Sequence, residues 1–317
     1  MTRMRKEDAI RVLFSVRQAA RAFPYERYLF TLFPSFALLL ASDKIGASEI
    51  LLFTLAFAFA MAAGFIYNTV CDAEKDPEAK NPITRGDMST KRAVRALVLS
   101  LFVATALFIW ASQSILAIFS FAVYMWIWFA YSGLGARLKE SVLGPVAASI
   151  VLWSGPPTLL LVSSSYFNIS AALLVLGLFS IYTSHEIRHT IIDYDIDVAY
   201  DNKTFAVILG QKHASIVAYT ALTFGSVFIL ASAYFPPPSF SVSILLLFAL
   251  LFIISIASTA LYESRRNYHL PGGVRFTTLP YVVTAIFIIT FGFTVLRLPL
   301  IFAFFASWFY LVSPWSS

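Results

Sequence analysis

The chain has 317 residues, of which 59% are hydrophobic and only 13% are charged. This composition excludes an ordinary soluble domain and predicts an integral membrane protein that spans the bilayer several times. The net charge of +6 does not indicate nucleic-acid binding, because 21 of the 23 Lys and Arg residues fall in the N-terminal arm and in alternate loops, with Lys44 and Arg297 as the exceptions. This positive-inside distribution predicts that the N-terminus and those loops are cytoplasmic in a cell membrane.

Residues 1–25 form a basic arm, for which we predict a cytoplasmic interfacial helix, although a solvated arm explains the same residues. Residues 26–317 are predicted to form a single transmembrane domain. Runs of about 20 apolar residues are long enough to cross the ~30 Å hydrocarbon core. The predicted spans are 26–42, 48–70, 92–111, 113–131, 143–164, 168–188, 214–235, 240–262 and 276–296. Residues 298–313 are also apolar and fit a continuation of the ninth helix, an interfacial segment or a tenth span. Gly155-Pro156-Pro157 is expected to kink the fifth span.

Two rows of polar residues follow spans 2 and 6. The first acidic row is Asn68, Asp72 and Asp76, and the second is Asp193, Asp197 and Asp201. Their four-residue spacing would place each row on one face of a helix that continues out of the membrane. The repetition of an apolar span, an acidic row and a lysine predicts two similar helical bundles around a central cavity that opens to the cytoplasm.

Carboxylates near a bilayer are costly unless they pair, bind metal or face water. Mg²⁺ commonly takes one or two carboxylates and fills its remaining positions with phosphate oxygens and water. Two rows with neighbouring cations therefore suit two Mg²⁺ ions that are bridged by a diphosphate. Such a site would stabilise diphosphate as a leaving group, and an isoprenoid tail would lie among the apolar helices.

These residues resemble the motifs of the UbiA superfamily of intramembrane prenyltransferases. The first acidic row matches the family pattern Asn-x-x-x-Asp-x-x-x-Asp, and residues 81–86 resemble its Arg-Pro-Ile-x-x-Gly. Asp193 and Asp197, with Lys203 six residues further on, match the second motif. The resemblance covers nearly the whole chain, including the nine-helix layout.

The resemblance implies specific roles for individual residues. The implied Mg²⁺ ligands are Asn68, Asp72, Asp76, Asp193 and Asp197. The implied contacts to the diphosphate are Lys203, Arg137, Lys139, Lys80 and Arg85, of which Lys80 or Arg85 would compensate for Asn81 at a position where relatives usually have Arg. Asp72 and Asp193 would carry the catalytic effect, and Glu186 or His189 would orient an acceptor or take its proton. An interfacial polar cluster explains Glu186 and His189 equally well.

The implied reaction joins a prenyl group from a polyprenyl diphosphate to an acceptor. The acceptor class stays open between an aromatic quinone precursor and a prenylated glycerol phosphate. A membrane terpene cyclase is an alternative enzyme. A cation or phosphate transporter is an alternative from another class, although its coupling carboxylates would more often lie near the bilayer midplane. Membrane lipid is an expected partner, and the sequence indicates no obligatory protein partner.

Overall fold

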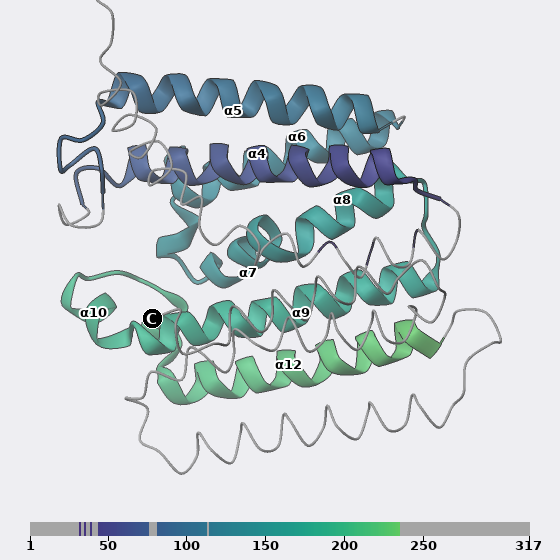
Figure 1. The fold of residues 1–317 in the computed structure, drawn as a ribbon. Helices are drawn as coiled ribbons and strands as arrows, with labels where there is room; N and C mark the ends of the chain where they lie inside the picture. The colour runs from purple at the N-terminus through teal and green to yellow at the C-terminus, as the bar shows by residue number, and fades with distance from the viewer. Residues whose placement is uncertain are drawn as a thin grey trace, which may run out of the picture. The chain divides into compact units, whose positions relative to one another are not determined.

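The computed structural model describes residues 44–75, 81–112 and 114–234, together with Leu32, Ser35 and Leu39. The described chain is helical, and it divides into two compact units (Figure 1). The first unit contains Ile45–Ser165, and the second contains the helices that follow Tyr166. The first acidic row begins in the first unit, and the second row belongs to the second unit.

Over its described residues, the first unit contains three long helices and one composite helix. These are α4 (Ala47–Cys71), α5 (Thr90–Ala111), α6 (Ile115–Ser132), and α7 (Gly144–Ala148) joined through the π-helical η2 (Ser149–Ser154) to α8 (Gly155–Ser163). Helix α4 packs along α5 and also contacts α6. The stacked rings of Phe108 and Phe121, with centroids 4.4 Å apart, join α5 to α6. A Cβ atom on Gly64 would lie 2.4 Å from the ring of Trp128, so the missing side chain lets α4 and α6 approach closely.

The expected distortion of the fifth span is present as a π-helical segment just before Pro156. The N–H of Gly155 donates to the carbonyl of Ile150, five residues earlier, and Pro156 has no N–H to offer Val151. The carbonyl of Val151 instead accepts a hydrogen bond of 2.8 Å from the Tyr124 hydroxyl of α6. The indole N–H of Trp128 donates to the same hydroxyl at 3.0 Å. A side chain from a neighbouring helix thus satisfies the carbonyl that the proline leaves unpaired.

Replacing Tyr124 by Phe is therefore expected to lower the free energy of unfolding by about 1–2 kcal/mol. The change leaves the buried Val151 carbonyl without its hydroxyl donor and the Trp128 indole without its acceptor. Unfolding of the purified protein in detergent micelles by a denaturing detergent measures the effect. Tyr200, whose side chain is exposed, provides the matched control, and Tyr200→Phe should leave the unfolding curve in place. Equal curves for the two variants would contradict this role of Tyr124.

Between Tyr166 and Tyr234, the described part of the second unit contains two long helices and two short ones. They are α9 (Ile169–Ile192), α10 (Tyr194–Ala199), α11 (Phe205–Leu209) and α12 (Gln211–Tyr234). Helices α9 and α12 lie side by side (Figure 1). A Cβ atom on Gly225 would lie 2.9 Å from the carbonyl oxygen of Gly177, so these two glycines mark a close approach of the backbones. Nearer the same end of the pair, the Ser170 hydroxyl donates to the carbonyl of Ser232 at 2.8 Å.

Five helical segments of the described chain are long and apolar enough to cross a membrane. They are Ala47–Cys71, Thr90–Ala111, Ile115–Ser132, Gly144–Ser163 and Ile169–Ile192. These segments match the predicted spans 2 to 6 within a few residues, and α12 covers most of the seventh. The basic arm 1–25, most of span 26–42, spans 240–262 and 276–296, and the apolar segment 298–313 lie outside the described residues. The predicted total of nine spans and the orientation of the cavity therefore stay predictions.

Candidate functional site

The cytoplasm-facing end predicted for α4 carries two buried residues of the first acidic row. Asn68 and Asp72 are each 7% exposed. Helix α4 ends at Cys71, and Asp72 is its C-cap residue, so the row does not continue on one regular helix as its spacing suggested. The backbone N–H of Asp72 still donates to the carbonyl of Asn68 at 2.9 Å, which keeps the two residues one turn apart. Asp76 and Lys80 lie outside the described residues.

The loop between α6 and α7 brings two cations to this helix end. Leu134 and Arg137 have left-handed backbone conformations, with φ angles of 48° and 39°. Such conformations are uncommon for residues other than glycine and tend to occur at functional sites. The Tyr67 hydroxyl of α4 accepts a hydrogen bond of 3.2 Å from the N–H of Leu134, which ties the strained loop to the helix. The sequence-predicted residues Arg137 and Lys139 thereby come within contact of the first acidic row.

Lys139 binds three oxygen atoms from two residues. Its ammonium nitrogen lies 2.9 Å from Asn68 Oδ1 and 2.6 Å from Asp72 Oδ1, and it also contacts Asp72 Oδ2. The oxygens of Asn68 and Asp72 therefore converge on a single positive group. Carboxylate and amide oxygens are hard ligands of the kind that Mg²⁺ prefers, so this donor set fits the expected metal.

Arg137 connects Asp72 to Glu140, a residue that the sequence analysis did not single out. Its Nη2 donates to Asp72 Oδ1 at 3.0 Å and to Glu140 Oε1 at 2.6 Å, and its Nη1 donates to the carbonyl of Cys71 at 3.4 Å. Lys75 adds a second cation to Glu140, at 3.1 Å from Oε1. Glu140 thus fixes the guanidinium over the helix end. The sequence feature that could have identified Glu140 is its position three residues after Arg137, a spacing at which opposite charges often pair.

The charges around Glu140 shift its ionisation. Partial burial by itself would raise the pKa of Glu140, but the hydrogen bonds and charges of Arg137 and Lys75 outweigh burial and hold the pKa below its ordinary value. The hydrogen bond to Glu140 is the main reason that the pKa of Arg137 is raised. A carboxyl group with a lowered pKa stabilises the folded state above its ordinary pKa of about 4.5, and that contribution disappears as the pH falls through the folded-state pKa.

Glu140→Gln is accordingly expected to destabilise the protein at neutral pH and to make no difference in acid. The free energy of unfolding of the two proteins should differ near pH 7, and the difference should shrink as the pH falls below the ordinary pKa of 4.5 and through the lower folded-state pKa of Glu140. Unfolding curves recorded in detergent between about pH 3 and pH 7 measure this. A difference that stays constant across this range would show that the ionisation of Glu140 is not what stabilises the loop.

The segment after the first acidic row is anchored through Asn81. This side chain is 1% exposed, its amide donates to the carbonyl of Thr69 at 2.9 Å, and its Oδ1 accepts from the N–H of Ile83 at 3.0 Å. The hydroxyl of Thr84 also donates to the carbonyl of Ala73 at 2.6 Å. Asn81 therefore has a structural role at the position where relatives usually have Arg. The guanidinium of Arg85, proposed to compensate for it, pairs with Asp87.

The second acidic row spans the junction between α9 and α10 in the second unit. Asp193 is exposed, and its position as the C-cap of α9 interrupts the helix for one residue before α10 begins. The N–H of Asp197 donates to the carbonyl of Asp193 at 2.8 Å, so the four-residue spacing still forms one turn. The Asp197 carboxylate accepts hydrogen bonds from Thr204 Oγ1 at 2.8 Å and Asn202 Nδ2 at 3.2 Å. Asp197 thus also holds the loop that contains Lys203, which is exposed.

Asp201 adopts a left-handed conformation with a φ angle of 54°, which is typical of a residue in a turn.

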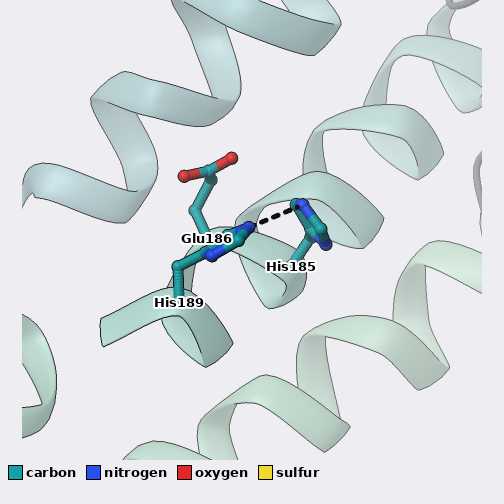
Figure 2. A group of neighbouring side chains, drawn as sticks. All are labelled: His185, Glu186 and His189. Carbon is teal, nitrogen blue, oxygen red and sulfur yellow. Dashed lines mark hydrogen bonds between the residues drawn. The ribbon is translucent and has the colours of Figure 1, made fainter. Parts of the chain in front are cut away.

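Glu186 and His189 lie on α9 one to two turns before Asp193. His189 and the buried His185 contact each other through their Nε2 atoms at 3.1 Å, and Glu186 lies beside them (Figure 2). The sequence analysis named Glu186 and His189 but missed the pairing of His189 with His185.

Comparisons with known proteins agree with the motifs. The model of the UbiA prenyltransferase family matches residues 28–271. A search of the curated proteins finds no match. A UbiA homolog from Archaeoglobus fulgidus, bound to GPP and Mg²⁺, has a similar structure, with a TM-score of 0.64 at 17% identity over 87% of this chain and 98% of the homolog.

Two further solved structures are similar. The apo UbiA homolog from Aeropyrum pernix K1 has a TM-score of 0.65 at 18% identity, over 83% of this chain and 98% of the homolog. A structure reported for digeranylgeranylglyceryl phosphate synthase in membranes has a TM-score of 0.63 at 16% identity, over 88% of this chain and 97% of the other. At these identities the likeness establishes the fold, while the family match covers most of the sequence. The chain is a member of the UbiA prenyltransferase family.

Proposed function

We propose that this protein is an intramembrane enzyme that transfers a prenyl group from a prenyl diphosphate to an acceptor, with Mg²⁺ as the cofactor. The observation that carries the proposal is the convergence of Asn68 and Asp72 oxygens on the ammonium group of Lys139. A cation belongs at this point of the helix end, which has the partial negative charge of the α4 C-terminus. When Mg²⁺ is present, it would neutralise the negative charge that develops on the leaving diphosphate.

The residues of the first unit have distinct roles in this proposal. Asn68 and Asp72, with Asp76, would hold Mg²⁺. Lys139 and Arg137 both form ion pairs with Asp72. They would give up part of these contacts and bind diphosphate oxygens when the substrate is present. Glu140 would act as a positioning residue for Arg137, since it binds both Nε and Nη2 of the guanidinium.

In the second unit, Asp193 and Asp197 would supply further metal ligands for the same diphosphate, and Lys203 would contact it directly. The support is the match of both rows to the family motifs, together with the two Mg²⁺ ions that such carboxylates suit. The side chains of Asp193 and Lys203 are exposed and would be available to a charged headgroup. Lys80 and Arg85 are retained as secondary candidates for diphosphate contacts.

The proposed reaction begins with cleavage of the allylic carbon–oxygen bond, whose electron pair goes to the diphosphate. The resulting carbocation is attacked by an electron pair of the acceptor, and a proton leaves the product to a base, for which Glu186 is the candidate. Apolar helix surfaces would exclude water from the cation. Two acceptor classes are proposed, an aromatic quinone precursor and a prenylated glycerol phosphate. The second has added support from the likeness to a digeranylgeranylglyceryl phosphate synthase structure.

The test follows radiolabelled geranylgeranyl diphosphate with the purified protein in lipid nanodiscs. Diphosphate release should require Mg²⁺, stop on addition of EDTA, and be accompanied by label on one of the two acceptor classes. A labelled cyclic hydrocarbon or alcohol with no acceptor would instead identify a terpene cyclase. Failure to release diphosphate at any prenyl chain length, from folded protein with acceptors present, would overturn the enzyme proposal.

We further propose that the active-site loops face the cytoplasm, as the positive-inside distribution predicts.

A further inference from the structure

Helix α9 carries the sequence His185-Glu186-Ile187-Arg188-His189 shortly before the second acidic row. Residues four apart on a helix lie on one face, and in the His-Glu-x-x-His pattern on a helix the two histidines bind a metal ion while the glutamate acts as a general base. In this protein the two imidazole Nε2 atoms lie 3.1 Å apart. A carboxylate oxygen of Glu186 and one ring nitrogen of each histidine all lie within 4.8 Å of one another (Figure 2).

The distance between the two histidines is close to the value that a shared metal ion requires. Zn²⁺ binds imidazole nitrogen at about 2.0–2.1 Å, so two ligands at the tetrahedral angle would be roughly 3.3 Å apart. The rings are perpendicular, with an interplanar angle of 90° and centroids 4.6 Å apart, and each ring presents its Nε2 atom to the other. Two imidazoles that share one proton would give the same contact, so the experiment must separate a metal from a proton.

We propose that His185, Glu186 and His189 bind a divalent first-row transition-metal ion, with Zn²⁺ as the representative, at a site chemically distinct from the Mg²⁺ ligands. Imidazole nitrogen favours Zn²⁺, Co²⁺ and related ions, whereas Mg²⁺ prefers oxygen. The Glu186 carboxylate oxygen lies within 4.8 Å of the two ring nitrogens, so it would have to move closer by up to about 1.5 Å to share an ion with them. The inference rests on the geometry of α9 and does not depend on the proposed prenyl transfer, and Glu186 could serve as the base of that reaction only while it is not bound to a metal ion.

The surroundings of the three residues bear on the strength of binding. His185 is 6% exposed, so its ring is held by packing and does not need to be ordered when the metal binds. His189 is exposed and leaves a route for the ion to enter. Arg188 lies in the same turn, and its charge opposes a cation, which predicts weaker binding than in a dedicated structural zinc site. Three protein ligands leave a coordination position open for water or an oxygen of a small molecule.

The experiment measures metal binding by the full-length protein in detergent after treatment with EDTA and return to buffer with excess Mg²⁺. Co²⁺ is titrated in, and its visible absorption reports imidazole coordination, after which Zn²⁺ should displace it. We expect one bound Co²⁺ per chain. His189→Gln should weaken the affinity by about 10-fold or more, and Glu186→Gln should also weaken it. His213→Gln is the matched control, because His213 is an exposed histidine on α12.

His189→Gln is the decisive variant, because the side chain is exposed and its replacement should leave the fold intact; a thermal unfolding curve without metal confirms this. The proposal is overturned if the wild-type protein binds no Co²⁺ or Zn²⁺ in the presence of Mg²⁺, which leaves a proton shared between the rings. It is also overturned if His189→Gln binds as well as the wild type, or if His213→Gln loses binding equally. None of these readouts uses a prenyl diphosphate, so they remain separate from the test of the proposed function.

Discussion

Replacing Asp72 by Asn is expected to reduce Mg²⁺-dependent release of diphosphate by about 10³-fold or more. The variant keeps the shape of the side chain and one acceptor oxygen, but it removes the negative charge that faces Lys139 and Arg137. With that charge absent, the proposed Mg²⁺ site loses one of its ligands. The initial rate of diphosphate release at saturating prenyl diphosphate measures the effect.

The control for Asp72→Asn is Glu74→Gln, which removes the same charge two residues further on. Glu74 is exposed, and it makes no match to the family motif. Glu74→Gln should retain most of the activity. If the folded Asp72→Asn variant releases diphosphate within about 10-fold of the wild-type rate, Asp72 is not a metal ligand, because general electrostatic effects account for changes of that size.

Asp193→Asn is expected to lower the same rate by about 10²- to 10³-fold while leaving the second unit folded. Asp193 is the better test of the second row than Asp197. The Asp197 carboxylate accepts hydrogen bonds from Thr204 and Asn202, so its replacement would disturb the loop as well as any metal. The rate of diphosphate release by Asp193→Asn is measured as the Mg²⁺ concentration is raised. The loss of a metal ligand should increase the Mg²⁺ concentration that gives half of the maximal rate.

Asp195→Asn provides the comparison for Asp193→Asn. Asp195 is also exposed, lies two residues away in the first turn of α10, and points off the Asp193–Asp197 face by the helical period. The Asp195→Asn variant should therefore release diphosphate at nearly the wild-type rate. If the two variants lose activity equally, the second row acts through its total charge and not through a defined ligand.

The sequence was sufficient to predict the long helices of the described chain and to single out Arg137 and Lys139, which contact Asp72 in the structure. Long apolar runs have few alternatives in a bilayer, so the predicted spans 48–70 and 92–111 agree with α4 and α5. The distortion before Pro156 was also predictable, because proline cannot donate the hydrogen bond that a helix requires. Its form as a π-helical segment depended on Tyr124 reaching Val151, which is a tertiary contact.

Other parts of the site depended on contacts between distant residues. Glu140 gains its role from Arg137 and Lys75, and Lys75 lies 65 residues away in the sequence. Asn81 reaches back to the carbonyl of Thr69, which the family pattern with Arg at this position did not suggest. The ends of helices were also hard to predict, because Asp72 and Asp193 fit a continuous helical period while the backbone turns at both residues.

The measurement that tests the central claim most directly is Mg²⁺-dependent binding of an unreactive prenyl thiodiphosphate by calorimetry. It compares the wild-type protein with Asp72→Asn, Asp193→Asn and the double variant. If the two rows bind metal ions on one diphosphate, each single variant should lose the Mg²⁺-dependent part of the affinity, and the double variant should lose little more. Binding by either single variant that equals the wild type would show that the two acidic rows do not act on the same ligand.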